Sequence, residues 1–114
     1  MMKVAIIGSR NLFVENIGEY IPTGITEIVS GGAKGIDTCA KQYAELNKIK
    51  ITEFLPDYSK FGRKAPLLRN LEIIDYADEI IAFWDGKSRG TRFVIENSKR
   101  KNKKVTVVLL LNEV

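Results

Sequence analysis

The sequence predicts an α/β fold, a Rossmann-like three-layer α/β/α sandwich with a mostly parallel five-stranded sheet. Most of five short apolar or β-branched runs are continuous rather than alternating, which is typical of strands that are buried on both faces. Segments with the apolar spacing of helices separate these runs, so strands and helices alternate along the chain. The chain has 114 residues, the usual size of one domain, and we expect residues 1–114 to form a single domain.

The expected strands cover residues 4–7, 27–30, 51–55, 79–84 and 105–111. Four stripes of residues at helical spacing predict the helices between them. These stripes are Phe13, Ile17, Tyr20 and Ile21; Ile36, Cys39, Ala40, Tyr43 and Ala44; Leu67, Leu71 and Ile74; and Thr91, Val94, Ile95 and Ser98. Residues 56–66 are the longest irregular piece, either a lid loop or a plain connection. The last run is long for an edge strand, so either a partner subunit covers it or it is a central or helix-covered strand.

The composition narrows the range of functions. Cys39 is the only cysteine, so no intramolecular disulfide can form and a reducing compartment is favoured. The absence of histidine removes the commonest general base and the commonest transition-metal ligand, so we expect no metal site and assign no cofactor. No apolar run approaches the ~20 residues of a membrane span. The first residues read as a strand rather than a signal peptide, and we expect a cytoplasmic location without membrane contact.

The charge of the chain fits a small anionic partner. A net charge of +4 is modest for a protein that binds nucleic acid. The basic run at residues 99–104 closes the last helix, where cations complement the negative end of the helix dipole. No aromatic residues interleave these charges, so a solvated helix end is favoured over a nucleic-acid patch.

Three glycine-bearing loops leave strands at one edge of the expected sheet. Ligands of open α/β sheets bind at the carboxyl ends of the strands, where the strand order reverses. Together with two polar residues of the third helix, these loops provide the candidate ligand-binding residues. They are Gly8, Ser9, Arg10, Gly31, Gly32, Ala33, Gly35, Asp37, Arg69, Asn70, Asp85, Gly86, Ser88, Gly90 and Thr91.

Each residue type in this set has a use in binding phosphate. Glycine lets backbone N–H groups point at an anion, and a following helix adds its unpaired amides. Serine and threonine hydroxyls donate hydrogen bonds, and Arg10 and Arg69 can pair with phosphate in a bidentate geometry. Asp85 is placed to accept a hydrogen bond from a sugar hydroxyl. Asp37 also fits the first turn of a helix, and Arg69-Asn70 also fits the polar face of an amphipathic helix.

The order of these motifs resembles a known family. The chain resembles the YspA-type, YpsA-related branch of the SLOG superfamily in five segments: Gly8-Ser9-Arg10, residues 29–37, Arg69-Asn70, residues 75–78 and residues 81–92. That superfamily unites the Smf/DprA DNA-processing proteins with the LOG ("lonely guy") phosphoribohydrolases. The resemblance implies a Rossmann-like fold and a ligand related to nucleotides, NAD or ADP-ribose. It implies no known reaction. Because members of the superfamily often dimerise, the resemblance also allows a homodimer or higher homo-oligomer of this chain.

One departure from the LOG pattern bears on catalysis. LOG enzymes carry Pro-Gly-Gly-x-Gly-Thr-x-x-Glu, whose glutamate acts with an upstream arginine in cleaving the N-glycosidic bond. Here Gly90-Thr91 matches, but Val94 occupies the place of the glutamate, and Glu96 is rotated from it by about 200° around a helix. The catalytic residues therefore stay unassigned, with Asp37, Asp85 and Glu96 as the only carboxylates near the loops.

The leading prediction is a binding module that senses or carries a nucleotide or a nucleotide-derived phosphate ligand. The first alternative is a nucleotide-processing N-glycosidase or phosphoribohydrolase of the LOG type, which needs a carboxylate beside the ligand. The second alternative is DprA-like binding of single-stranded DNA through the basic run at 99–104, with an affinity that falls steeply with salt.

Overall fold

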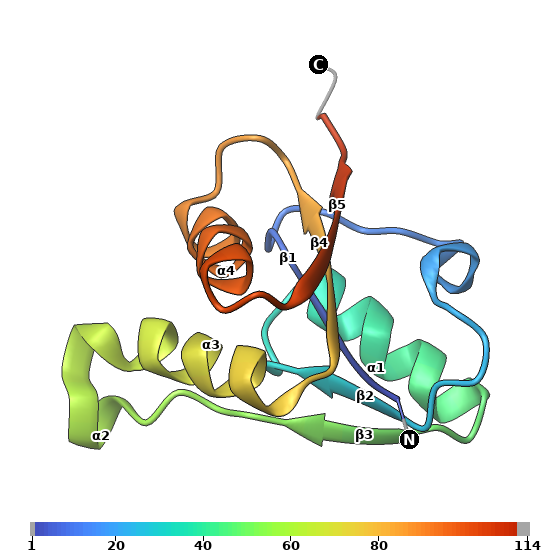
Figure 1. Ribbon diagram of the computed structural model, residues 1–114, viewed down its shortest axis with the longest axis horizontal. Helices are drawn as coiled ribbons and strands as arrows, with labels where there is room; N and C mark the ends of the chain where they lie inside the picture. The colour runs from blue at the N-terminus through green and yellow to red at the C-terminus, as the bar shows by residue number, and fades with distance from the viewer. Residues whose placement is uncertain (1, 112–114) are drawn as a thin grey trace.

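The structure, a computed structural model, describes residues 2–111 and confirms the α/β class (Figure 1). Its strands are β1 (Lys3–Gly8), β2 (Glu27–Ser30), β3 (Lys50–Glu53), β4 (Glu79–Trp84) and β5 (Lys104–Leu109). Its α-helices are α1 (Ile36–Leu46), α2 (Tyr58–Phe61), α3 (Ala65–Tyr76) and α4 (Arg89–Arg100), and two 3₁₀ turns, η1 (Ile17–Tyr20) and η2 (Gly62–Lys64), complete the elements. All strand pairs are parallel, so the expectation of a mostly parallel sheet is met in full.

The strands lie in the order β3-β2-β1-β4-β5. The chain builds the sheet outward from β1 to β3, crosses over through α3, and then builds outward again from β4 to β5. The order therefore reverses between β1 and β4, which pair from Val4↔Glu79 to Gly8↔Phe83. The carboxyl ends of these two strands are the position at which a sheet of this type leaves room for a ligand.

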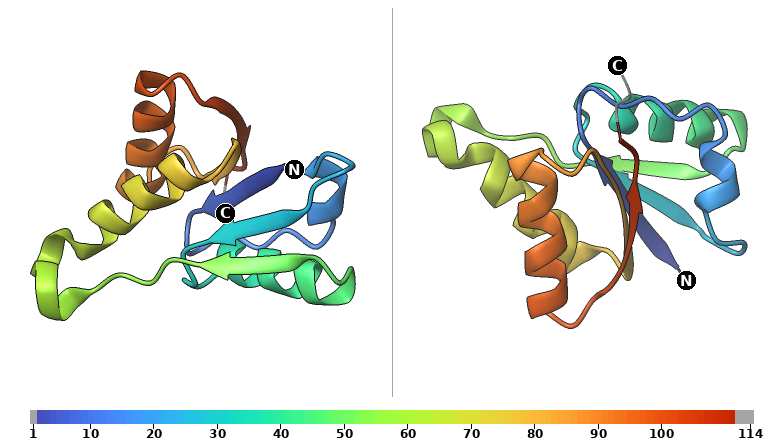
Figure 2. Two further views of the ribbon diagram at one scale, coloured as in Figure 1. Left: turned by 60° about the horizontal axis from the view of Figure 1, so that its bottom comes forward. Right: turned by 90° about the horizontal axis from the view of Figure 1, so that it is seen from above.

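The helices cover the two faces of the sheet as a right-handed connectivity requires (Figure 2). Alternate residues of β1 point to opposite faces and enter two separate cores. Val4 and Ile6 pack in a cluster with α1 and with residues 12–21. Ala5 and Ile7 pack in a second cluster with α3 and α4. The three-layer sandwich is thus confirmed.

The expected first helix is wrong. Only one turn of 3₁₀ helix, η1, forms in that segment, and Phe13 is 72% exposed. Gly18 lowers helix propensity, and Pro22 disfavours helical backbone at the residue before it. Gly18 also lets the turn pack closely, since a Cβ there would come within 2.6 Å of the Tyr43 ring on α1. Tyr20 then stacks edge-on against Phe83, with ring centroids 5.3 Å apart.

The expected irregular piece at residues 56–66 is mostly helical. Asp57 caps α2, because its carboxylate accepts from the Lys60 amide at 3.2 Å and from the Ser59 hydroxyl at 2.6 Å. η2 follows, and α3 begins at Ala65 with Pro66 in its first turn, where proline is tolerated. α2 and the start of α3 project from the body of the protein as an arm (Figure 2).

Smaller differences concern the remaining elements. Leu67, expected on the buried stripe of α3, is 40% exposed, since the start of α3 extends beyond the sheet. β5 is an edge strand rather than a central one, with α4 packed against it. Val107 and Leu109 of β5 are exposed, and cover by a partner subunit stays a prediction. Among the described residues, no helix is long and apolar enough to cross a membrane.

Candidate functional site

A cavity of about 600 Å³ opens at the carboxyl ends of β1 and β4, where the strand order reverses. It will be called the central cavity. Its walls come from all three glycine-bearing loops and from one side of α3. Twelve of the residues predicted from the sequence line it: Gly8, Ser9, Arg10, Gly31, Ala33, Asp37, Arg69, Asn70, Asp85, Ser88, Gly90 and Thr91.

Three predicted glycines lie outside its lining. Gly32 lines an adjoining cavity, and Gly86 gives the β4–α4 loop its positive φ of 82° close to Leu109 and Leu111. Gly35 lies behind the β1 loop, where a Cβ would come within 2.5 Å of the Arg10 carbonyl oxygen. These positions are set by turn geometry and backbone packing rather than by contact with a ligand in the central cavity.

Gly8 lines the cavity, but its main constraint is also packing. A Cβ at this position would lie 2.5 Å from Ile36 Cγ1 and 2.8 Å from the Phe83 carbonyl oxygen. Both distances are shorter than any normal carbon contact, so only glycine lets the start of α1 pack against the end of β1. The glycine therefore brings the β2–α1 loop toward the site, which is a different use from the expected approach of backbone to ligand.

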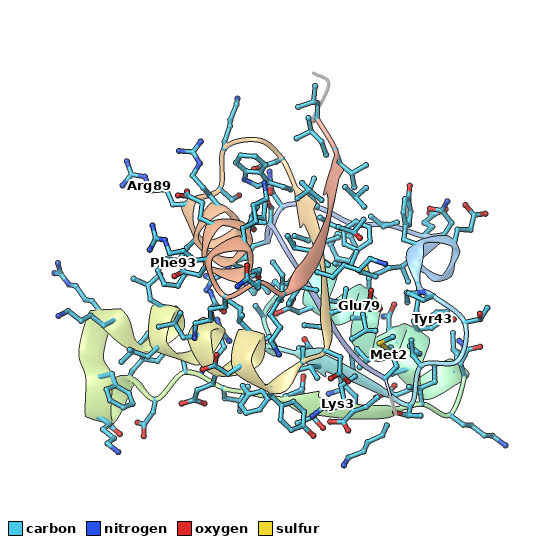
Figure 3. The ribbon with its side chains drawn as sticks, viewed as in Figure 1. Met2, Lys3, Tyr43, Glu79, Arg89 and Phe93 are labelled. Atoms are coloured by element: carbon cyan, nitrogen blue, oxygen red, sulfur yellow. The ribbon has the colours of Figure 1, made fainter. Side chains whose placement is uncertain are left out.

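Six lining residues were not among the predicted ones: Ile7, Asn11, Pro66, Arg89, Ile73 and Val94. Ile7, Ile73 and Val94 belong to the core pattern, and nothing in their spacing distinguishes a cavity wall from a core position. Asn11 and Arg89 follow predicted residues directly, so their polar character at the loop was the available signal. Figure 3 shows the Arg89 side chain extending outward from the first turn of α4, at the rim of the cavity.

Buried hydroxyls join the end of β1 to the start of α4. The Oγ of Ser9 lies 3.5 Å from the Oγ1 of Thr91, and these residues are 2% and 5% exposed. The same Ser9 Oγ accepts a hydrogen bond from the Asp85 amide at 3.3 Å. Two hydroxyls 3.5 Å apart form at most a weak hydrogen bond, so both retain the capacity to bind a ligand oxygen.

Asp85 organises the β4–α4 loop. Its Oδ1 accepts from the amides of Ser88 at 2.7 Å and Lys87 at 2.9 Å, and its Oδ2 accepts from the Ser88 hydroxyl at 3.0 Å. These hydrogen bonds lower the pKa of Asp85 to about 2, and the bond from the Ser88 amide has the largest effect. The carboxylate is therefore ionised at neutral pH and mostly occupied by its own loop. The expected hydrogen bond from a sugar hydroxyl would have to be accepted by Oδ2, which also accepts from the Ser88 hydroxyl.

The lowered pKa predicts a pH-dependent contribution to stability. Because the folded value of about 2 lies below the unfolded value of about 3.9, the contribution is full well above pH 4 and is lost as the pH falls toward 2. We expect Asp85→Ala to lower the free energy of unfolding by about 1 kcal/mol at pH 7, and by clearly less at pH 3. Urea denaturation at the two pH values measures this.

The exposed Glu96 on α4 supplies the control, since no hydrogen bond to its carboxylate is found in the part of the chain that the structure describes. Glu96→Ala should change stability little at either pH. A deficit of Asp85→Ala that is as large at pH 3 as at pH 7 would contradict the assigned role of the carboxylate.

The first turn of α4 presents free amides to the cavity. Its first helical hydrogen bond runs from the Arg92 amide to the Ser88 carbonyl at 3.2 Å. The Ser88 hydroxyl bonds Asp85 and does not cap the helix. Among residues 2–111, no acceptor is found for the amides of Arg89, Gly90 and Thr91. A Cβ at Gly90 would meet nothing within 4 Å, so this turn is open to an approaching anion.

Arg69 is a buried cation at the wall of the cavity. It is 8% exposed, and its Nη1 donates to the carbonyl oxygens of Gly31 at 2.6 Å and Phe54 at 3.2 Å. Its Nε donates to the Asn70 side chain at 2.9 Å. Burial lowers the pKa of the guanidinium, and the nearby Asp37 carboxylate raises it. Arg69 therefore fastens the β2–α1 loop to the end of β3, in addition to bringing a charge to the cavity.

Asp37 completes this arrangement from α1. The side chain is 6% exposed, and its Oδ2 accepts from the Ala33 amide at 3.0 Å. Burial raises the pKa of this carboxyl, while the Ala33 amide and the Arg69 charge lower it. Asp37 thus shapes the β2–α1 loop. A Cβ at Gly31 would lie 2.5 Å from Arg69 Nη1, so a side chain there would displace the guanidinium.

The carboxylates available for catalysis are few. Asp37 and Asp85 line the cavity, and both accept hydrogen bonds from loop amides. Glu96 is exposed and does not line the cavity, whereas Val94 does. Within the described residues, no group of three or more carboxylate or thiol side chains could hold a metal ion.

Comparisons of the chain with protein-family models, with curated proteins and with solved structures give no match.

Proposed function

We propose that the protein binds a nucleotide or a nucleotide-derived phosphate ligand in the central cavity, as a sensor or carrier. The observation that carries the proposal is the open first turn of α4, which faces the same cavity as the hydroxyls of Ser9 and Thr91. Uncapped amides, the positive end of a helix dipole and two hydroxyls are the donors that a phosphate group needs.

The surrounding charges and walls favour the same kind of ligand. Arg10 and Arg89 lie exposed at the cavity and bring positive charge to its mouth. Ile7, Ile73 and Val94 give it an apolar floor, against which a sugar or a base can lie. A volume of about 600 Å³ falls in the usual range for sites that bind small molecules. Hydrogen-bond donors for a phosphate beside an apolar wall support a nucleotide or a nucleotide-derived phosphate as the ligand.

Membership of the SLOG superfamily is part of this proposal. It is supported by the order of the motifs in the chain and by their meeting at one cavity on a Rossmann-like sheet. The LOG-type reaction stays an alternative that depends on Asp37 or Asp85, because Glu96 lies outside the cavity. An assay for released base therefore accompanies the binding test.

DNA binding through residues 99–104 has less support. Lys101 pairs with Asp75 at 2.6 Å, and Lys104 pairs with Glu79 at 3.1 Å. Lys103 donates to the carbonyl oxygen of Ala77 at 2.6 Å. These lysines hold the end of α4 and the start of β5 against the α3–β4 junction. A structural role for residues 99–104 is therefore favoured over DNA binding.

We expect AMP to stabilise the protein and adenosine to do so much less. A ligand at 100 times its Kd adds roughly 2.7 kcal/mol to the free energy of unfolding, which is roughly 10 °C in Tm for a domain of this size. Thr91→Val removes one hydroxyl at nearly constant volume and should weaken AMP binding about tenfold. Thermal shift followed by titration calorimetry measures both effects, and chromatography of the incubated mixture detects any released adenine.

The control is Thr106→Val on β5, which makes the same chemical change outside the central cavity and should leave AMP binding unchanged. The proposal fails if no nucleotide or sugar phosphate stabilises the protein, or if adenosine binds as well as AMP. Released adenine would move the assignment from a carrier to the enzyme alternative.

A further inference from the structure

A second cavity, of about 500 Å³, adjoins the central one. It will be called the side cavity. The two cavities share four lining residues: Arg10, Gly31, Ala33 and Arg69. The side cavity is completed by Gly32 and Lys34 of the β2–α1 loop and by Leu55 and Pro56, which follow β3. The two cavities therefore lie side by side, and Arg69 lines both.

Positive charge gathers in the side cavity. Arg10, Lys34 and Arg69 all line it, and the charge of Arg10 is close enough to lower the pKa of Arg69. Arg10 and Lys34 are exposed, and neither forms an ion pair within residues 2–111. Two carboxylates lie near the side cavity. Glu53 Oε2 is 3.2 Å from where a Gly32 Cβ would be, and Asp37 Oδ2 is 3.2 Å from where a Gly31 Cβ would be; neither residue is part of the lining of the side cavity. Cations that lack a partner in the protein favour an anionic occupant.

The other wall of the side cavity is apolar. Leu55 is 67% exposed, and Pro56 follows it. Gly32 keeps the space beside Leu55 open, because a Cβ there would lie 2.7 Å from Leu55 Cδ2, and its φ of +69° is one that side chains rarely adopt. The side cavity thus combines a cationic wall with an apolar wall, next to the central cavity that the first turn of α4 lines.

We propose that the side cavity holds a second anionic group of the same ligand, so that the preferred ligand is a nucleotide with two separate phosphate-bearing positions. This inference rests on the proposed function, because the first phosphate is the one assigned to the first turn of α4. Lys34 provides specificity for the second phosphate. Arg69 lies between the two groups and is held in place by the carbonyls of Gly31 and Phe54.

The test compares three ligands by titration calorimetry: AMP, adenosine 3′,5′-bisphosphate and NADP. The bisphosphate carries its second phosphate on the ribose 3′ oxygen, and NADP carries a phosphate on the ribose 2′ oxygen in addition to its 5′ diphosphate. We expect at least one of the two larger ligands to bind tenfold or more tightly than AMP. Lys34→Ala should remove that gain and leave the affinity for AMP within twofold. Lys34 is exposed and makes no hydrogen bond within residues 2–111, so this variant should fold normally.

Lys41→Ala is the matched control, because Lys41 is an exposed lysine of α1 that lines neither cavity. It should change none of the three affinities by more than twofold. If AMP binds and neither larger ligand binds more tightly, the inference is wrong and the proposed function stands. The inference is also wrong if Lys34→Ala weakens AMP and the larger ligands equally. If none of the three binds, the proposed function fails with it.

Discussion

Arg69→Ala is expected to lower the free energy of unfolding by about 3 kcal/mol. The guanidinium is 8% exposed and holds the carbonyl oxygens of Gly31 and Phe54. Its removal leaves both carbonyls without this donor and leaves the buried Asp37 carboxylate without the nearby cation. A buried charge that loses its compensating charge is among the most damaging changes in a protein. Urea denaturation at pH 7 measures the loss.

A double-mutant cycle separates the charge effect from the lost hydrogen bonds. Asp37→Asn keeps an acceptor oxygen for the Ala33 amide and removes the negative charge that Arg69 balances. The double variant with Arg69→Ala should therefore be more stable than the sum of the single losses predicts, by about 1 kcal/mol. Arg63→Ala, at an exposed arginine of η2, is the control and should cost little. Strict additivity of Arg69→Ala and Asp37→Asn would contradict the charge coupling.

Gly35→Ala is expected to cost about 4 kcal/mol or more, or to prevent folding. The residue has a φ of +73°, and a Cβ would lie 2.5 Å from the carbonyl oxygen of Arg10 and 2.8 Å from that of Leu12. Both obstacles are backbone atoms of the β1 loop, which itself borders the central cavity, so no side chain can move aside. The yield of folded protein and its thermal melting measure the effect.

Gly24→Ala is the matched control for this substitution. Gly24 has a similar φ of +79°, but a Cβ there meets nothing within 4 Å. It should cost only the backbone strain, about 1–2 kcal/mol. The difference between the two variants is then the cost of separating the β1 loop from the start of α1. Equal losses for Gly35→Ala and Gly24→Ala would show that this close approach does not matter.

The fold was largely predictable because burial on both faces leaves a strong pattern. Residues 4–7 and 80–84 are apolar at every position, which is typical of strands in a parallel sheet that is covered on both faces. The stripe of α4 was also predicted in full, and Thr91, Val94, Ile95 and Ser98 are all buried. Such elements depend on local periodicity, which the sequence carries by itself.

The elements that the sequence did not reveal depend on single contacts rather than on a repeating pattern. The expected helix before residue 22 became η1, because Gly18 packs against Tyr43 of α1, and turns and irregular backbone make up the rest of the segment. α2 depends on one capping side chain, Asp57, in a stretch without apolar periodicity. Neither feature leaves a repeating pattern along the chain.

The location of the candidate site was predictable, but the roles of its residues were not. Loops at the ends of β1, β2 and β4 have to meet at one edge once the sheet is parallel, and they do. Gly8, Gly35, Asp37 and Arg69 fit a phosphate site by residue type, yet each is also fixed by contacts within the protein. Sequence alone does not distinguish a residue that contacts ligand from one that shapes the loop.

The most direct test of the central claim is a titration of the ¹⁵N-labelled protein with AMP, followed by two-dimensional NMR. If a phosphate binds at the first turn of α4, the amide signals of Gly90 and Thr91 should shift most, together with that of Ser9 across the cavity. Adenosine should leave the Gly90 and Thr91 signals nearly unchanged. Shifts confined to α2 or to residues 99–104, or no shifts at millimolar AMP, would contradict the assignment of this cavity as a nucleotide site.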